Sequence, residues 1–376
     1  MVTKNFDAKT FKTTLGNEKM KNKYYEYLKE AKSYSDLTID AMKKSIYRYE
    51  EFSNFEDFGK FNKTKAIAFK EWLENRQATR KNKKISATTY YQYVRHLKSF
   101  FEWLVFKSNF KTKIKNDDIE YLNVSKQVKK IANSTRAINY PSIDEAKTII
   151  NSIEIKNEID MRDRALLSFA LLTGMRDFAI ATLPIGCFDD KNLVVYQDPA
   201  KGVKTKFSKT ITTNIFRFDD ELLKYVLDWF EYLKTKKDFK ESDPLFPQCN
   251  IEMSKDSDMF VSNTIKPEFW ASGNSIRNIF KKRCKEAEVE YFRPHSFRHT
   301  ALDLAVSSSR NGEEIKAVSQ NVGHEHVSTT MSTYARMSDK RVNNLISNMR
   351  FDSRTANISD DVLLAEIETI IRRHKK

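Results

Sequence analysis

Four side chains that could handle a phosphodiester lie close together in the last third of the sequence. His295 and Arg298 are one helical turn apart. His324 follows Gly323, and Tyr334 comes ten residues later. An imidazole transfers protons near neutral pH, a guanidinium binds two phosphate oxygens at once, and a phenol is a nucleophile once it is deprotonated. The combination predicts an enzyme that holds a phosphate ester, moves its protons and attacks its phosphorus.

Two further basic residues are candidates because glycines lie beside them. Arg176 follows the apolar stretch 160–173 and Gly174, and Lys201 lies in the turn DPAKG, just before Gly202. Glycine permits positive φ and lets the backbone approach a ligand closely, as a phosphate pocket requires. Taken alone, each basic residue would be interpreted as a solvent-exposed group.

The chain carries a large excess of positive charge. Its 66 Lys and Arg against 51 Asp and Glu give a net charge of +15, with an isoelectric point near 9.4. Such a charge attracts polyanions, so nucleic acid or an anionic membrane surface are the candidate partners. No run approaches the roughly 20 apolar residues of a spanning helix, and the first residues lack an apolar signal region. We therefore expect an intracellular protein without a membrane partner.

The three cysteines favour neither a disulfide framework nor a zinc module. Cys187, Cys249 and Cys284 are odd in number, widely spaced and without a C-x-x-C pair. Oxidised frameworks and zinc modules need paired, closely spaced cysteines. We expect reduced thiols.

The length of 376 residues exceeds what one hydrophobic core usually supports, so we expect two domains. The scarcity of Gly and Pro favours helices over a turn-rich β fold. The expected organisation is a short polar N-terminus (1–16), a helical domain (17–112), a linker (113–140), a second domain (141–350) and a C-terminal tail (351–376).

Several helices are predicted from periodicity and capping residues. Ser86 can cap a helix that buries an apolar stripe up to Leu104, and Ser142 with Glu145 forms a capping-box pattern that opens the second domain. Further helices are expected over 160–173, ending at Gly174, and over 219–236, 274–287, 340–350 and 358–373.

The β structure is expected to be small. Residues 193–197 and 206–213 alternate in polarity and suit an edge hairpin around the turn 198–202. The segment from about 248 to 272 fits no period, and we interpret it as a surface excursion.

A basic run surrounds the helix that Ser86 caps. Residues 76–115 include eleven Lys or Arg and a single acid, Glu102. A solvated helix face is one interpretation; a surface that tracks phosphates is the other, because each neutralised phosphate releases counterions. The residues predicted to bind DNA are Arg76, Arg80, Lys81, Lys83, Lys84, Arg95 and Lys98.

The order TGMR, AKG, HSFRHT, VGH and a tyrosine ten residues later resembles the tyrosine recombinase (phage integrase) family. The family's six catalytic residues fall here, without departure, on Arg176, Lys201, His295, Arg298, His324 and Tyr334. The resemblance covers about residues 141–350 directly, and the basic helical domain at 17–112 is similar to the family's core-binding domain. It implies a mainly α fold with a small β-sheet in the catalytic domain, forming a two-domain, C-shaped clamp on duplex DNA.

The resemblance also implies a role for each residue. Tyr334 attacks the phosphorus and leaves a 3′-phosphotyrosyl link, with His295 as the proton acceptor and Lys201 as the acid for the 5′-hydroxyl. The two arginines bind the non-bridging oxygens, and His324 donates a hydrogen bond to the phosphate. Lys204, Lys206 and Lys209 follow Lys201 on the same hairpin and are the alternatives for this acid.

The implied activity is site-specific cutting and rejoining of DNA, without metal, ATP or another cofactor. The implied partners are specific double-stranded recombination sites and a homotetramer in which the tail helix docks on a neighbour, with an accessory DNA-bending or directionality factor as a further candidate. The setting is cytoplasmic and nucleoid-associated. Integration, excision, transposition, multimer resolution and inversion all stay open, as do the DNA site and the host.

Other interpretations compete with this one. A type IB topoisomerase-like relaxing enzyme shares the chemistry, and an architectural DNA-binding protein without catalysis could share the fold. A zinc site built from His295 and His299 with His324 and His326 is disfavoured, because no cysteine lies near, the acids are scattered and the arginines would repel a cation. Tyr334 as an ordinary core tyrosine is the remaining alternative.

Overall fold

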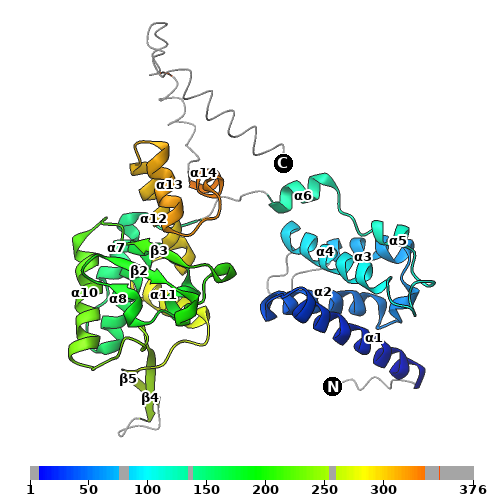
Figure 1. The fold of residues 1–376 in the computed structure, drawn as a ribbon, viewed down its shortest axis with the longest axis horizontal. Coiled ribbons are helices and arrows are strands. Elements are labelled where there is room, and N and C mark those ends of the chain that lie inside the picture. The colour runs from blue at the N-terminus through cyan, green and yellow to red at the C-terminus, as the bar shows by residue number, and fades with distance from the viewer. Residues whose placement is uncertain (1–7, 76–83, 134–138, 254–259, 335–346, 348–376) are drawn as a thin grey trace. The chain divides into compact units, whose positions relative to one another are not determined.

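The computed structural model describes residues 8–75, 84–133, 139–253, 260–334 and residue 347 (Figure 1). The chain divides into two compact units, Met1–Arg136 and Ala137–Lys376. Most of the described residues are helical and the sheets are small, as the sequence predicted.

The described part of the first unit is helical apart from an isolated bridge at Lys84. Ser35 and Ser86 cap two of its helices by accepting from the backbone N–H three residues on, so the predicted start after Ser86 is confirmed. Its elements are α1 (Ala8–Glu26), a π-helical turn η1 (Tyr27–Ala31), α2 (Asp36–Ser53), η2 (Phe58–Lys60), α3 (Lys63–Asn75), α4 (Ala87–Leu104), α5 (Asn116–Glu120) and α6 (Lys126–Asn133).

Aromatic rings fill the core of the first unit. The ring of Tyr49 on α2 packs edge-on against Phe69 of α3 at 5.4 Å and against Phe101 of α4 at 5.3 Å. All three are buried, so these helices close around one apolar centre.

The segment 113–140, which we expected to be a linker, has regular structure in its described part. It contains α5 and α6, and Ile114, Ile119 and Leu122 are buried in the core of the first unit. Helices of five and eight residues are too short to show a sustained period, so only packing identifies them.

The second unit holds most of the chain. Its elements are α7 (Ile143–Asn151), α8 (Glu158–Thr173), α9 (Asp177–Ala181), η3 (Ile185–Cys187), β1 (Phe188–Asp189), β2 (Val194–Gln197), η4 (Pro199–Lys201), η5 (Lys206–Ser208), β3 (Ile211–Asn214), α10 (Asp220–Thr235), β4 (Gln248–Met253), β5 (Phe260–Lys266), α11 (Gly273–Glu286), α12 (Pro294–Ser308), α13 (Gly312–Asn321) and α14 (Val327–Tyr334). The predicted capping box at Ser142 and Glu145 is present, and the predicted helices over 160–173, 219–236 and 274–287 correspond to α8, α10 and α11.

Helix α8 is the central element of the second unit. Nearly all its residues are buried, and it packs against α10 and α12. Buried charges also fix α11 to it: Arg283 Nε donates to Asp163 at 2.8 Å, and its Nη2 donates to Asp160 at 2.7 Å. Buried charges are tolerated because they are paired.

Two small antiparallel sheets lie in this unit. Strands β1, β2 and β3 form one, in that order, with Val195 opposite Thr213. The strand predicted over 206–213 begins only at Ile211, because Phe207 and Ser208 have positive φ and cannot continue an extended chain.

The second sheet corrects a sequence prediction. Residues 248–272 were expected to form an irregular excursion, but β4 and β5 pair there as a hairpin with a register shift between Asn250 and Glu252 (Figure 1). The two strands are joined by backbone hydrogen bonds, which do not require side chains of alternating polarity. The sequence therefore gave no clear signal of them. The helices predicted over 340–350 and 358–373 lie outside the described residues, apart from residue 347.

Among the described residues, no helix is long and apolar enough to cross a membrane.

Candidate active site

The end of α8 supplies the first part of the site. Gly174 terminates the helix in the left-handed conformation, with φ +58°, and its N–H caps the carbonyl of Ala170. The chain then turns into α9, whose N-cap is Arg176. Arg176 is half-buried at this turn, where the sequence alone would have allowed a fully exposed group.

Arg298 joins three segments of the second unit. Its side chain lies on α12 and is 2% exposed. Its Nη1 donates to the carbonyl of Gly174, and its Nη2 donates to the carbonyl of Val322 at 3.0 Å. The guanidinium therefore holds the end of α8 and the loop after α13 in one place.

His324 lies in that loop and contacts the same guanidinium. Its Nε2 is 2.9 Å from Arg298 Nη2, and its Nδ1 is 2.8 Å from the hydroxyl of Thr330 on α14. Because a guanidinium only donates, Nε2 accepts, and in the neutral ring Nδ1 carries the proton that it donates to Thr330. Burial, followed by the charges of Arg298 and Arg176, lowers the pKa of His324 to about 4.

The loop geometry around His324 depends on Gly323. This residue has φ +69°, and a Cβ there would lie 2.4 Å from Cδ1 of Ile211 on β3. Hydrogen bonds from Thr213 Oγ1 and the Asn214 N–H to Asn321 also join β3 to α13, at 2.7 and 2.6 Å. The small sheet therefore supports the loop that carries His324.

His295 stands at the N-terminal turn of α12 and is exposed. Its ring meets the buried ring of His299 edge-on, with centroids 4.7 Å apart, and His299 stacks on Tyr140 at 5.9 Å. Desolvation, then the charges of Arg298 and Arg176, lowers the pKa of His295. The imidazole is thus a proton acceptor beside two fixed positive charges.

Lys201 lies at the end of η4 and is exposed. Burial raises the pKa of the Cys187 thiol, and the positive charge of Lys201 lowers it by a smaller amount. The structure brings Arg176, His295, Arg298 and His324 together. Lys201 lies on the exposed loop before β3.

Tyr334 is the last residue of α14, one turn after Thr330. Its side chain falls outside the described part of the structure. Thr330 was missed by the sequence analysis; it is fully buried against His324, and a threonine in a helix gives no signal of such a contact.

Three of the residues predicted to bind DNA, Lys84, Arg95 and Lys98, belong to the described part of the first unit. Arg76, Arg80, Lys81 and Lys83 are outside the described residues, whereas Lys84 and Arg95 are exposed. Lys98 donates to Glu120 at 3.0 Å and to Asn123 at 2.9 Å, both on or beside α5. Lys98 pairs with Glu102 one turn further along α4, at 3.7 Å, and with Glu120, which is distant in sequence. The positive charge of the basic run is therefore partly offset at Lys98.

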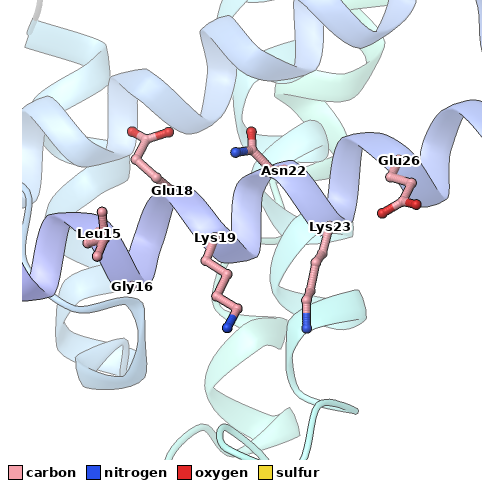
Figure 2. Close-up of a pocket in the computed structure, with 7 residues that line it drawn as sticks. All are labelled: Leu15, Gly16, Glu18, Lys19, Asn22, Lys23 and Glu26. Carbon is pink, nitrogen blue, oxygen red and sulfur yellow. The ribbon is translucent and has the colours of Figure 1, made fainter.

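Two other features carry less chemistry. A surface hollow of about 590 Å³ runs along α1, lined by residues of that helix alone, with Lys19 and Lys23 on one side (Figure 2). Its lining mixes both signs of charge. Among the described residues, no three His, Cys, Asp or Glu side chains are grouped so that they could hold a metal.

Comparison with known proteins points to one family. Residues 142–341 match the sequence model of the Phage integrase family. The chain is 24% identical over 313 residues to tyrosine recombinase XerC of Lactobacillus delbrueckii subsp. bulgaricus, covering 83% of this chain and 92% of that protein. It is 24% identical over 349 residues to XerC of Leptospira interrogans, covering 90% and 94%.

Solved structures share the fold at low identity. A lambda integrase(75-356) dimer bound to a COC′ core site aligns with TM-score 0.57 and 13% identity, over 86% of this chain and 97% of that one. The XerH site-specific recombinase bound to palindromic difH substrate aligns with TM-score 0.57 and 17% identity, over 87% and 84%.

Proposed function

The chain belongs to the phage integrase family of tyrosine recombinases, and from this premise we propose that it cleaves and rejoins DNA strands at specific sites through Tyr334. The alternative within the same fold is a DNA-binding protein without catalysis, and no observation favours it. The proposed reaction serves integration, excision or transposition of mobile DNA.

One observation carries the proposal: the side chains of Arg176, His295 and His324 converge around the guanidinium of Arg298. It contacts Gly174 and His324, and its charge acts together with that of Arg176 on both His295 and His324. Two guanidiniums beside two imidazoles suit a phosphodiester, whose two non-bridging oxygens take parallel hydrogen bonds. An architectural protein has no need of this arrangement.

The proposed chemistry is an exchange of one phosphodiester for another. The oxygen of Tyr334 attacks phosphorus, the bond to the 5′-oxygen breaks, and a 3′-phosphotyrosyl link remains. His295 accepts the phenolic proton, and Lys201 gives a proton to the departing 5′-oxygen. Arg176 and Arg298 stabilise the charge that develops on the phosphorane. A 5′-hydroxyl of another strand then reverses the same steps and joins DNA to DNA.

The proposed reaction needs no cofactor. The phosphotyrosyl bond retains the energy of the phosphodiester, so ATP has no role in rejoining. The two guanidiniums supply the positive charge at the phosphate that a metal ion supplies in other phosphoryl transfer enzymes.

We assign double-stranded DNA as the partner. The first unit is the proposed core-binding domain, with Lys84 and Arg95 as exposed phosphate contacts and Lys98 as a weaker one because of its acidic partner. Residues 351–376 are the proposed contact to a neighbouring subunit in a homotetramer assembled on DNA, and an accessory DNA-bending or directionality factor is a further candidate partner. The proposed setting is the cytoplasm, at the nucleoid.

The test mixes the full chain, in EDTA, with nicked duplexes of random sequence and looks on a denaturing gel for DNA bound covalently to protein. We expect an adduct with the unaltered chain and none with Tyr334→Phe. Sequencing the trapped DNA then gives the site. If neither protein forms an adduct while both retard DNA on a native gel, catalysis through Tyr334 is rejected and a binding protein takes its place.

A further inference from the structure

The connection between β2 and β3 presents a large apolar ring to solvent. Phe207 is 72% exposed, although Phe is among the residues that most often lie inside a protein. It has φ +61°, and Ser208 after it has φ +50°. Two successive non-glycine residues in the left-handed region cost conformational free energy, and such strain concentrates at functional sites.

Hydrogen bonds hold this loop in place. The backbone N–H of Lys204 donates to the hydroxyl of Thr182 at 2.9 Å, and the hydroxyl of Thr205 donates to the carbonyl of Lys209 at 2.7 Å. Phe207 lies between the two residues of the second bond. The exposed ring is therefore presented by a closed turn with defined geometry.

The same loop is fixed beside the candidate active site. The ammonium of Lys209 lies 3.3 Å from the carboxylate of Glu325, the residue after His324. Two residues further on, Ile211 packs under Gly323. An open hollow of about 540 Å³ is lined by Lys209, Ile211, Gly323 and His324 among others. A ligand held at His324 would thus have the β2–β3 loop as its neighbour.

The lysines around Phe207 indicate that the ligand is negatively charged. Lys201, Lys204, Lys206 and Lys209 surround it in the sequence, and no acid occurs between residues 199 and 218. The ammonium of Lys206 lies 4.8 Å from the centroid of the Phe207 ring. An apolar ring among cations suits a polyanion with flat apolar faces, which is what the bases and sugars of DNA provide.

We propose that Phe207 is a DNA-contacting wedge, whose ring packs against the face of a base in the duplex beside the phosphate held by Arg298 and His324. Lys204 and Lys206, both exposed on the same loop, bind the flanking phosphates. The inference rests on the proposed function, since it takes the DNA to be the substrate of the same site. It adds a residue that acts on the stacking of the bases and not on the phosphate.

The experiment probes base stacking without relying on cleavage. DNA is first selected from a random pool by gel retardation with the full-length Tyr334→Phe protein. Permanganate, which oxidises unstacked thymines, is then applied to the bound DNA. The proteins compared are Tyr334→Phe alone and combined with Phe207→Ala, Phe207→Trp or the control Phe269→Ala, which removes an exposed ring outside the lysine-rich loop.

We expect one or two reactive thymines with Tyr334→Phe. Phe207→Ala should lower that reactivity at least about fivefold and weaken binding about fivefold to a hundredfold, as the loss of one ring–base contact does. Phe207→Trp should retain both, and Phe269→Ala should change neither. Melting temperatures of the variants, expected to be unchanged because Phe207 is exposed, show that each remains folded.

The outcomes separate this inference from the proposed function. If Phe207→Ala leaves the permanganate reactivity unchanged, the wedge is rejected, whatever happens to DNA affinity and whatever the adduct assay gives. If the adduct assay fails but Phe207→Ala still lowers permanganate reactivity, the DNA contact stands and strand transfer is rejected. If Phe207→Ala impairs only assembly of several subunits on DNA, the ring serves a protein contact and the wedge is again rejected.

Discussion

The Nη2 atom of Arg298 lies 2.9 Å from Nε2 of His324, so the guanidinium donates to the imidazole. His324 in this state has no second proton with which to donate to a phosphate, the role that the family resemblance implies for it. A bound phosphate would compete for the guanidinium and, as an anion, would raise the pKa of His324 from about 4. The donor role of His324 therefore requires the phosphate itself.

Thr330 orients His324 through the 2.8 Å contact to Nδ1. Thr330→Val keeps the shape of the side chain and removes the hydroxyl, which contributes about 1 kcal/mol as a hydrogen bond. We expect the rate of adduct formation to fall about fivefold to tenfold with DNA affinity unchanged. Single-turnover cleavage of the selected site measures the rate. Thr329→Val, on the exposed face of α14, is the control; equal rates for both variants would show that Thr330 does not orient the ring.

Gly323 combines two constraints that can be separated. Gly323→Ala places a Cβ against Ile211 and forces an alanine to φ +69°. We expect the unfolding free energy of the second unit to fall by about 2–4 kcal/mol, from left-handed strain and overpacking together. Gly202 has φ +90°, and a Cβ there would meet open space. Gly202→Ala therefore measures the cost of the left-handed backbone alone. Gly312→Ala has neither constraint and should be near neutral. Urea unfolding measures all three, and a Gly323→Ala cost no larger than that of Gly202→Ala would remove Ile211 from the account.

His299 should make stability depend on pH. Burial, then the charges of His295 and Arg298, lowers its pKa to about 4 from an ordinary value of 6.5. The unfolded chain therefore binds more protons than the folded chain between those values. Stability is complete above pH 6.5 and falls as the pH drops towards 4, by up to about 1.4 kcal/mol per pH unit for each such histidine.

The measurement is urea unfolding at several pH values between 4 and 7. His299→Gln should lower the slope by close to one proton, while His324 still contributes its own. His326→Gln, which changes an exposed histidine, is the control. A slope that His299→Gln leaves unchanged would exclude its titration as a cause of acid destabilisation.

The identity of the acid among the loop lysines can be decided by the leaving group. A substrate with sulfur in place of the bridging 5′-oxygen expels a thiolate, which needs no proton, since thiols ionise near pH 8.5. We expect Lys201→Ala to slow cleavage of ordinary DNA about a hundredfold or more and to leave the sulfur substrate nearly unaffected. Lys204→Ala and Lys206→Ala are matched controls on the same loop. If Lys204→Ala or Lys206→Ala instead slows cleavage of ordinary DNA and leaves cleavage of the sulfur substrate unaffected, that lysine is the acid.

Local signals predicted many elements of the fold correctly. Ser142 with Glu145, Ser86 and Gly174 mark helix ends through hydrogen bonds to residues three or four positions away, so the sequence carries the whole signal. The pairing of β4 with β5 and the packing of α5 depend on residues far along the chain. These were missed, because no short window contains both partners.

The sequence by itself determined which groups are available for chemistry: their types, their order, and the excess of cations that selects a polyanion. Only the tertiary structure decided how Arg298, His324 and Thr330 are bonded, and that Lys98 pairs with Glu120. It also decided that the turn carrying Phe207 is joined through Lys209 to Glu325, the residue after His324. The reason is physical. A side chain's type sets which bonds it can form, whereas its proton, charge and exposure are set by neighbours that folding brings from distant parts of the chain.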